Sequence, residues 1–175
     1  MILEIFALLC LISGFGLLFI LSVIDLKIGL LPNIYNASLA VCGLAFHACL
    51  GFAVISPLYI LAGAALGGGL LWGIRFIANR LYQQDTLGLG DVKLLAAGGI
   101  WLGPHGVLLA ITLGASAGIL HSLLVLGLKC LKAKEIGKLS HFSIPAGPGF
   151  AIGIALAFAI EHGAAISGII SKLLA

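Results

Sequence analysis

The chain has 175 residues, of which 62% are hydrophobic and 9% charged, with a mean hydropathy of +1.26 and a formal net charge of +3. Soluble domains are roughly half apolar, so this composition excludes an ordinary soluble globular protein. Several apolar stretches reach the length of about 20 residues that crosses a hydrocarbon core as a helix, and only short loops separate them. The sequence therefore predicts a single integral-membrane domain over residues 1–175.

About six transmembrane helices are expected, and the fold class is an all-α polytopic membrane bundle. The first apolar stretch lacks a basic leader and ends on Asp25, so we interpret it as a transmembrane helix and not as a cleaved signal peptide. The fourth expected helix is short. In chain order the helices are predicted at residues 2–24, 34–54, 57–79, 91–103, 106–128 and 145–162.

The distribution of basic residues supports this helix count. With six helices, the loops after the first, third and fifth helices share one side of the membrane, and the other side carries only Lys172. The positive-inside rule then places the basic loops in the cytoplasm and both termini outside. The basic residues of these loops and their margins are Lys27, Arg75, Arg80, Lys93, Lys129, Lys132, Lys134 and Lys138.

Cysteine and histidine show no pattern typical of a metal site. The cysteines lack a C-x-x-C pair and mostly fall inside expected helices, which favours small buried side chains over a disulfide framework. The histidines His47, His105 and His121 lack the short spacing of metal ligands. Neither a metal nor a cofactor is predicted. The cysteines are Cys10, Cys42, Cys49 and Cys130.

The acidic residues divide into two groups. Glu4 and Glu161 lie near the outer ends of the first and last helices and Glu135 lies among lysines, so solvation or ion pairing explains them. An aspartate at mid-membrane costs at least about 2.5 to 3.5 kcal/mol by insertion scales, so acids near the membrane are functional candidates. The acids left to explain are Asp25, Asp85 and Asp91.

Asp25 and Asp91 are expected at one depth, because Asp25 closes the first helix and Asp91 opens the fourth at the same face. Two neighbouring carboxylates cannot both ionise easily, so one keeps a proton. This is the arrangement of an aspartic protease. The charged carboxylate takes a proton from the attacking water, and its protonated partner donates to the developing oxyanion.

The segment "TLGLGDVKLL" at residues 86–95 places two glycines before Asp91. Gly88 and Gly90 can adopt backbone angles closed to other residues and can let an extended substrate strand come close. Alternatively, Asp91 is an N-terminal helix residue stabilised by the helix dipole, and the glycines only form a loop. From G-x-G-D alone both interpretations stay open, because so short a motif recurs by chance.

The longer context resembles a known family. The segments "IDLKIGLLPN" at 24–33 and "LGLGDVKLLAAGGIWLG" at 87–103 resemble the two active-site segments of the prepilin peptidases, the G-x-G-D membrane aspartic proteases that process type IV pilins and pseudopilins. A third segment, "IPAGPGFAIG" at 144–153, resembles the Pro-x-Gly-Pro turn that opens the last helix of that family. Beyond the aspartate, the second segment matches at Lys93, Leu94, Leu95, Ala96, Ala97, Gly99, Trp101, Leu102 and Gly103.

The resemblance implies catalytic roles for Asp25 and Asp91 in the bacterial inner membrane, with the active site towards the cytoplasm. It also implies the substrate, a prepilin or pseudopilin whose short basic leader is cut after a glycine and just before the apolar helix. The expected partners are this substrate and the lipid bilayer, with no nucleic acid.

One departure from the family concerns the connection after the first helix. Many bacterial members carry there a cytoplasmic insert with paired C-x-x-C motifs, tied to N-methylation of the new amino terminus. Here the connection from Asp25 to the second helix is about ten residues without cysteine, and no extra amino-terminal helix is seen. Cleavage without methyl transfer is therefore expected, as in the short peptidases of Tad-type pilus systems or a stand-alone peptidase core. Ala146 stands where a bulkier residue is common, which leaves the subgroup open.

Two charged residues beside the motif each have two interpretations. Asp85 stands where the family often has an acid, and it either recognises the basic leader or is a solvated loop residue. Lys93 either tunes the proton affinity of the carboxylate pair or binds a lipid phosphate.

Prolines are expected to shape the chain at two places. Pro32 and Asn33 should break the chain before the second helix. Pro145, Gly147 and Pro148 should form a rigid entrance to the last helix, which can border the active site and contact the substrate.

Two other functions are weighed against the peptidase. A proton-coupled transporter or channel subunit could use the same carboxylates as relay groups. It would be expected to show acids spread through the membrane depth or broken helices in matching halves, and we find neither. A degenerate family member acting as an assembly scaffold would not need Asp25 and Asp91, which are both present.

Overall fold

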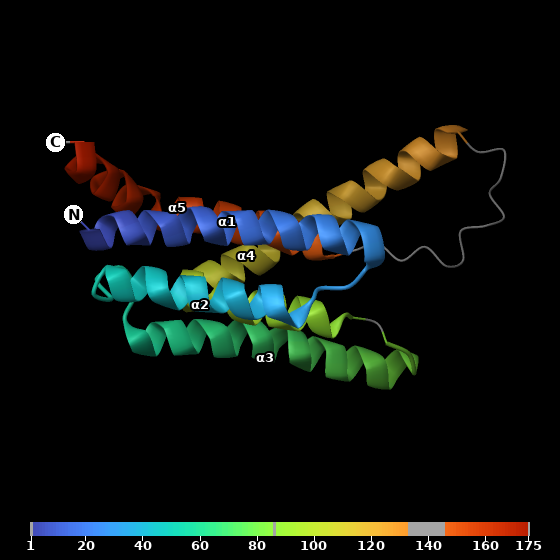
Figure 1. Cartoon of the computed structure of the whole chain (residues 1–175). Helices are drawn as coiled ribbons and strands as arrows, with labels where there is room; N and C mark the ends of the chain where they lie inside the picture. The colour runs from blue at the N-terminus through green and yellow to red at the C-terminus, as the bar shows by residue number, and fades with distance from the viewer. Residues whose placement is uncertain (1, 86, 133–145, 175) are drawn as a thin grey trace.

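A computed structural model describes residues 2–85, 87–132 and 146–174, and among these residues it contains helices and no strand. The expected all-α class is therefore confirmed (Figure 1). Both chain termini lie at one end of the bundle, and the end of α1 and the starts of α4 and α5 lie at the other. The helices are α1 (Ile2–Ile28), α2 (Asn33–Cys49), α3 (Pro57–Tyr82), α4 (Leu89–Lys132) and α5 (Gly147–Leu174).

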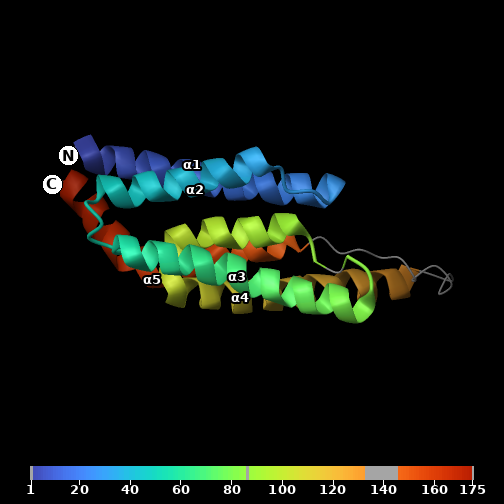
Figure 2. The ribbon, with the colours of Figure 1, turned by 90° about the horizontal axis from the view of Figure 1, so that it is seen from below.

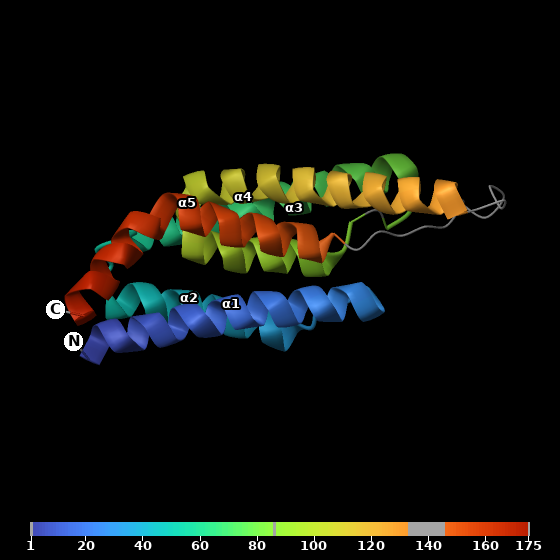
Figure 3. The same cartoon turned by 90° about the horizontal axis from the view of Figure 1, so that it is seen from above.

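The helix α4 is interrupted at Gly103, whose φ of 69° and ψ of −176° are not helical, and Pro104 follows it. A Cβ atom added at Gly67 of α3 would touch both the Leu95 carbonyl oxygen and the Val107 side chain, so these two parts of α4 flank one point. The chain therefore doubles back, and Figures 2 and 3 show the two halves running in opposite directions. These halves cover the two helices expected at 91–103 and 106–128.

Four of the described helices have a segment long and apolar enough to cross a membrane: Ile2–Ile28, Pro57–Tyr82, Leu89–Leu124 and Gly147–Leu173. The helix α2 has 17 residues, a length of about 26 Å, which is shorter than the hydrocarbon core of about 30 Å. The polytopic membrane class is confirmed, whereas the expected count of about six spanning helices is not. The last helix also runs past its expected end at residue 162, because the polar pair at 161–162 is followed by a further apolar stretch.

Close packing between α3 and the first half of α4 depends on facing glycines. A Cβ atom at Gly63 would overlap the backbone oxygen of Gly99, and a Cβ atom at Gly99 would overlap that of Gly63. Small residues at these positions let the two backbones approach, as is common in membrane bundles.

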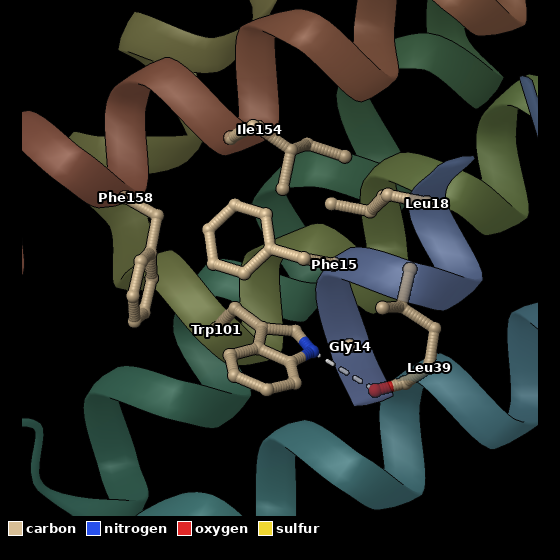
Figure 4. Close-up of a pocket in the computed structure, with 8 residues that line it drawn as sticks. Gly14, Phe15, Leu18, Leu39, Trp101, Ile154 and Phe158 are labelled. Atoms are coloured by element: carbon tan, nitrogen blue, oxygen red, sulfur yellow. Dashed lines mark hydrogen bonds between the residues drawn. The ribbon is translucent and has the colours of Figure 1, made fainter. Parts of the chain in front are cut away.

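Trp101 of α4 is buried and contacts three other helices, α1, α2 and α5 (Figure 4). Its indole lies against Gly14 of α1 and Gly43 of α2, where an added Cβ atom would come within 2.6 Å of the ring. The indole Nε1 donates a hydrogen bond of 2.9 Å to the carbonyl oxygen of Leu39. The aromatic rings packed against the indole belong to Phe46 of α2 and Phe158 of α5.

Candidate active site

Asp25 lies in the last turn of α1, and its side chain is only 6% exposed. The backbone N–H of Gly147, at the start of α5, donates a hydrogen bond of 2.9 Å to its Oδ2 atom. The first N–H groups of a helix have no intrahelical partner and carry partial positive charge, so this contact favours a carboxylate. A Cβ atom at Gly147 would lie 2.6 Å from the same oxygen. The approach therefore requires glycine.

Of the three residues expected at the entrance to the last helix, Gly147 contacts Asp25. Pro148 is partly buried in the first turn of α5, where the missing N–H of proline removes no intrahelical hydrogen bond. Pro145, the third residue expected at this entrance, lies outside the described residues.

Asp91 lies in the first turn of α4 and is 8% exposed. The start of α4, which carries Asp91, lies at the same end of the bundle as the end of α1, which carries Asp25, and the two carboxylates are near enough for their charges to repel each other. Burial removes most of the water that would otherwise screen their repulsion. Both carboxylates are buried, and a buried carboxyl group can hold or release a proton.

The two glycines of the motif act differently from the expectation. Neither has a positive φ, so the expected special backbone angles are wrong for both Gly88 and Gly90. What matters at each position is the missing side chain. A Cβ atom at Gly90 would lie 2.7 Å from the Cβ of Leu31, and one at Gly88 would lie 3.1 Å from Oδ2 of Asp91. Gly90 therefore lets the connection that follows α1 pack against the motif, and Gly88 places no side chain against the Asp91 carboxylate.

The connection that leads into the motif is held by Arg75 of α3. Its guanidinium donates to Oδ1 of Asp85 at 2.6 Å and also to the carbonyl oxygen of Leu87. Asn79 donates to the same Asp85 oxygen at 3.0 Å. The Asp85 side chain is 80% exposed, and its hydrogen bonds with Arg75 and Asn79 hold its loop against α3. Sequence reasoning assigned Arg75 only to the basic face, because nothing in its spacing links it to residues 85–87.

Lys93 makes a contact that neither expected role includes. Its ammonium donates a hydrogen bond of 2.7 Å to Oδ1 of Asn33, which joins the start of α4 to the start of α2. The expected break before the second helix is confirmed, since α1 ends at Ile28 and Pro32 caps α2 in an extended conformation. Residues 29–32 are the whole connection between these helices.

Comparison with known protein families agrees with this geometry. Residues 12–123, which include both aspartates, match the model of the type IV leader peptidase family. The chain belongs to this family.

Known relatives of this chain are named prepilin leader peptidase/N-methyltransferase. The Burkholderia pseudomallei (strain 1026b) protein is 36% identical over 115 residues, which cover 62% of this chain and 37% of that protein. The Dickeya chrysanthemi protein is 37% identical over 118 residues, 65% of this chain and 40% of its own length. The Xanthomonas campestris pv. campestris protein is 34% identical over 146 residues, which cover 80% of this chain and 48% of that protein. The chain thus spans less than half the length of these relatives. No solved structure matches it.

Two histidines of the described residues, His47 and His162, are buried. In the described ranges no group of three or more His, Cys, Asp or Glu side chains is placed to hold a metal ion. His47 is fully buried on α2 next to Phe46, and His162 is buried on α5 next to Phe158. Both therefore belong to the aromatic centre around Trp101.

Proposed function

We propose that this chain is an aspartic endopeptidase that removes the basic leader from type IV prepilins or pseudopilins. The observation that carries the proposal is the buried pair of Asp25 and Asp91, from two helices that meet at one end of the bundle. An isolated buried carboxylate is costly, and two that repel each other are more so. Such a pair is retained where the chemistry needs it. Membership in the leader peptidase family supports the same activity.

The mechanism divides the work between the two carboxylates. The Gly147 N–H bonded to Asp25 stabilises a negative charge there, so we assign Asp25 as the base that takes a proton from the attacking water. Asp91 then holds the proton and donates it to the oxygen of the substrate carbonyl as the tetrahedral intermediate forms. The absence of a side chain at Gly88 leaves room for the substrate backbone beside Asp91.

The position of the charges supports an active site at the cytoplasmic face. Lys27, Arg75, Arg80 and Lys93 lie on the helix ends nearest the aspartates, whereas Lys172 lies near the carboxyl end of α5. The positive-inside rule assigns the end rich in lysine and arginine to the cytoplasm. A prepilin leader, being basic and cytoplasmic, would meet the aspartates there, and the expected cut follows its glycine.

Cleavage without N-methylation is the second part of the proposal. Residues 29–32 are too few to hold a cysteine-rich insert between α1 and α2. This compact connection is the feature that resembles the short, Tad-type peptidases. Mass spectrometry of a prepilin after incubation with the protein should report a product with an unmodified amino terminus. A product heavier by one methyl group would contradict this part alone.

The decisive experiment replaces each aspartate in turn. Asp25→Asn and Asp91→Asn keep the size of the side chain but remove the acid, and each should lower kcat by at least about 100-fold. Cleavage of a co-expressed or purified prepilin, followed by gel shift and mass spectrometry, measures the effect. Glu161→Gln, at an exposed carboxylate in the middle of α5, is the matched control and should cleave normally. Processing retained in either aspartate variant would sink the proposal.

A further inference from the structure

A groove lies between α2, α3 and the first half of α4. Its volume is about 360 Å³, within the range of about 300 to 1,000 Å³ that is usual for ligand pockets. The walls are mostly alanine, including Ala37 and Ala40 of α2 and Ala64 of α3. At one end they give way to the polar side chains of Asn33, Asn36 and Lys93.

Asn36 is the unusual member of this lining. Its side chain is 4% exposed, yet neither Nδ2 nor Oδ1 has a hydrogen-bond partner in the described structure. An unpaired buried amide costs about 1 to 3 kcal/mol, and lipid tails cannot bond to it. Since the amide offers a donor and an acceptor side by side, its natural complement is a group that offers both as well. A polypeptide backbone does so.

The polar end of the groove belongs to the two segments that carry the aspartates. Lys93 follows Asp91 by two residues on α4 and is bonded to Asn33. The connection before Asn33 is packed against the motif, because the Leu31 side chain touches Gly90. A polypeptide held at the polar end would therefore be anchored to the same segments as the catalytic pair.

We propose that this groove binds the prepilin segment that follows the cut, the start of its apolar helix, and that Asn36 is a substrate-binding residue. The inference rests on the proposed function. The first turn of a helix leaves four N–H groups without intrahelical partners. Both amide atoms of Asn36 are buried in the free structure, so the side chain must turn toward the groove before one of these N–H groups can donate to its Oδ1. Nδ2 of Asn36 can donate to a carbonyl of the extended residues before that turn. The alanine walls let an apolar helix approach closely, as small residues do elsewhere in membrane bundles.

The first test removes the amide. Asn36→Leu keeps the shape of the side chain without its polar atoms, so folding should be unharmed. A residue that binds the substrate equally in the ground and transition states affects KM and not kcat. In Asn36→Leu we therefore expect the KM for a purified prepilin to rise about tenfold and kcat to stay unchanged. An unchanged KM, or a fall in kcat alone, would overturn the role of Asn36.

The second test compares two exposed alanines of α2, of which Ala37 lines the groove and Ala48 does not. Ala37→Phe narrows the groove and should raise KM, whereas Ala48→Phe should behave as the unsubstituted protein.

A photoreactive residue in place of Ala37, in the inactive Asp91→Asn protein, should crosslink to the prepilin, and one in place of Ala48 should not. A crosslink from position 37 to lipid alone would overturn the proposal.

The outcomes separate this inference from the proposed function. If Asp25→Asn and Asp91→Asn are inactive while Asn36→Leu and Ala37→Phe keep a normal KM, the groove proposal fails and the peptidase stands. If the aspartate variants still cleave, the peptidase mechanism fails, and the inference that rests on it fails as well.

Discussion

The aspartate end of the bundle and its aromatic centre are both built around glycines, but those glycines make room for different groups. At the aspartate end, the missing side chain of Gly147 lets a backbone N–H reach the Asp25 carboxylate. At the centre, the missing side chains of Gly14 and Gly43 let the Trp101 ring lie between α1 and α2. The first arrangement places one polar atom, whereas the second places a large apolar surface.

Under the proposed mechanism, the aspartate end carries the activity and the aromatic centre contributes mainly to stability. A single hydrogen bond contributes little net free energy to folding, about 1 kcal/mol, but it sets the position of a reacting group. A buried tryptophan contributes much more to stability through its area and contacts, and it touches no reacting group. Substitutions at the two places should therefore separate loss of cleavage from loss of folding.

The largest effect is expected at the aspartate end. In Gly147→Ala the new Cβ would lie 2.6 Å from the Asp25 oxygen, so the carboxylate must move. A displacement of about 1 Å at a catalytic group can cost about 100-fold, and we expect a loss of that size in kcat with little change in thermal stability. Single-turnover cleavage of a prepilin measures kcat, and a melting curve in detergent measures thermal stability.

Gly163→Ala, also on α5 but with nothing within 4 Å of the new Cβ, is the control. A normal kcat in Gly147→Ala would show that this hydrogen bond does not position Asp25.

An intermediate effect is expected at the aromatic centre. In Gly14→Ala the new Cβ would lie 2.6 Å from the Trp101 ring, which must shift within a packed core. Overpacking of this kind costs about 1 to 3 kcal/mol, so the melting temperature should fall while the folded protein keeps its kcat. Gly16→Ala on the same helix has open space around the new Cβ and should melt normally. Equal melting temperatures for the two variants would contradict the proposed role of the Trp101 contact.

The smallest effect is expected in the loop that leads to the motif. Asp85→Asn weakens an exposed ion pair with Arg75, and such pairs contribute about 0 to 1 kcal/mol. Stability and the KM for a prepilin with a basic leader should therefore remain close to those of the unsubstituted protein. Steady-state cleavage assays at low and high salt provide the measurement. A clear rise in KM that disappears at high salt would instead assign Asp85 to recognition of the leader.

Local sequence pattern was enough to predict the class of the fold, and it proposes Asp25 and Asp91 as the central pair of the site. Long apolar runs require helices in a membrane, because every backbone polar group must be bonded within its own segment. The family-like segments around Asp25 and Asp91 predicted that these two acids belong together, and the interaction between their charges agrees with that pairing. The short connection after Asp25 was likewise visible in the sequence and is present as residues 29–32.

Tertiary structure alone decided which neighbours these residues have. Gly147 bonds to Asp25 across 122 positions of the chain, and Arg75 holds the loop that contains Asp85 and Leu87. The unpaired amide of Asn36 is recognisable only once α2, α3 and α4 surround it. Hydropathy and motif spacing report how each segment meets the membrane or its nearest neighbours along the chain. They carry no information on which faces of separate helices pack together, because that depends on how all the side chains fit at once.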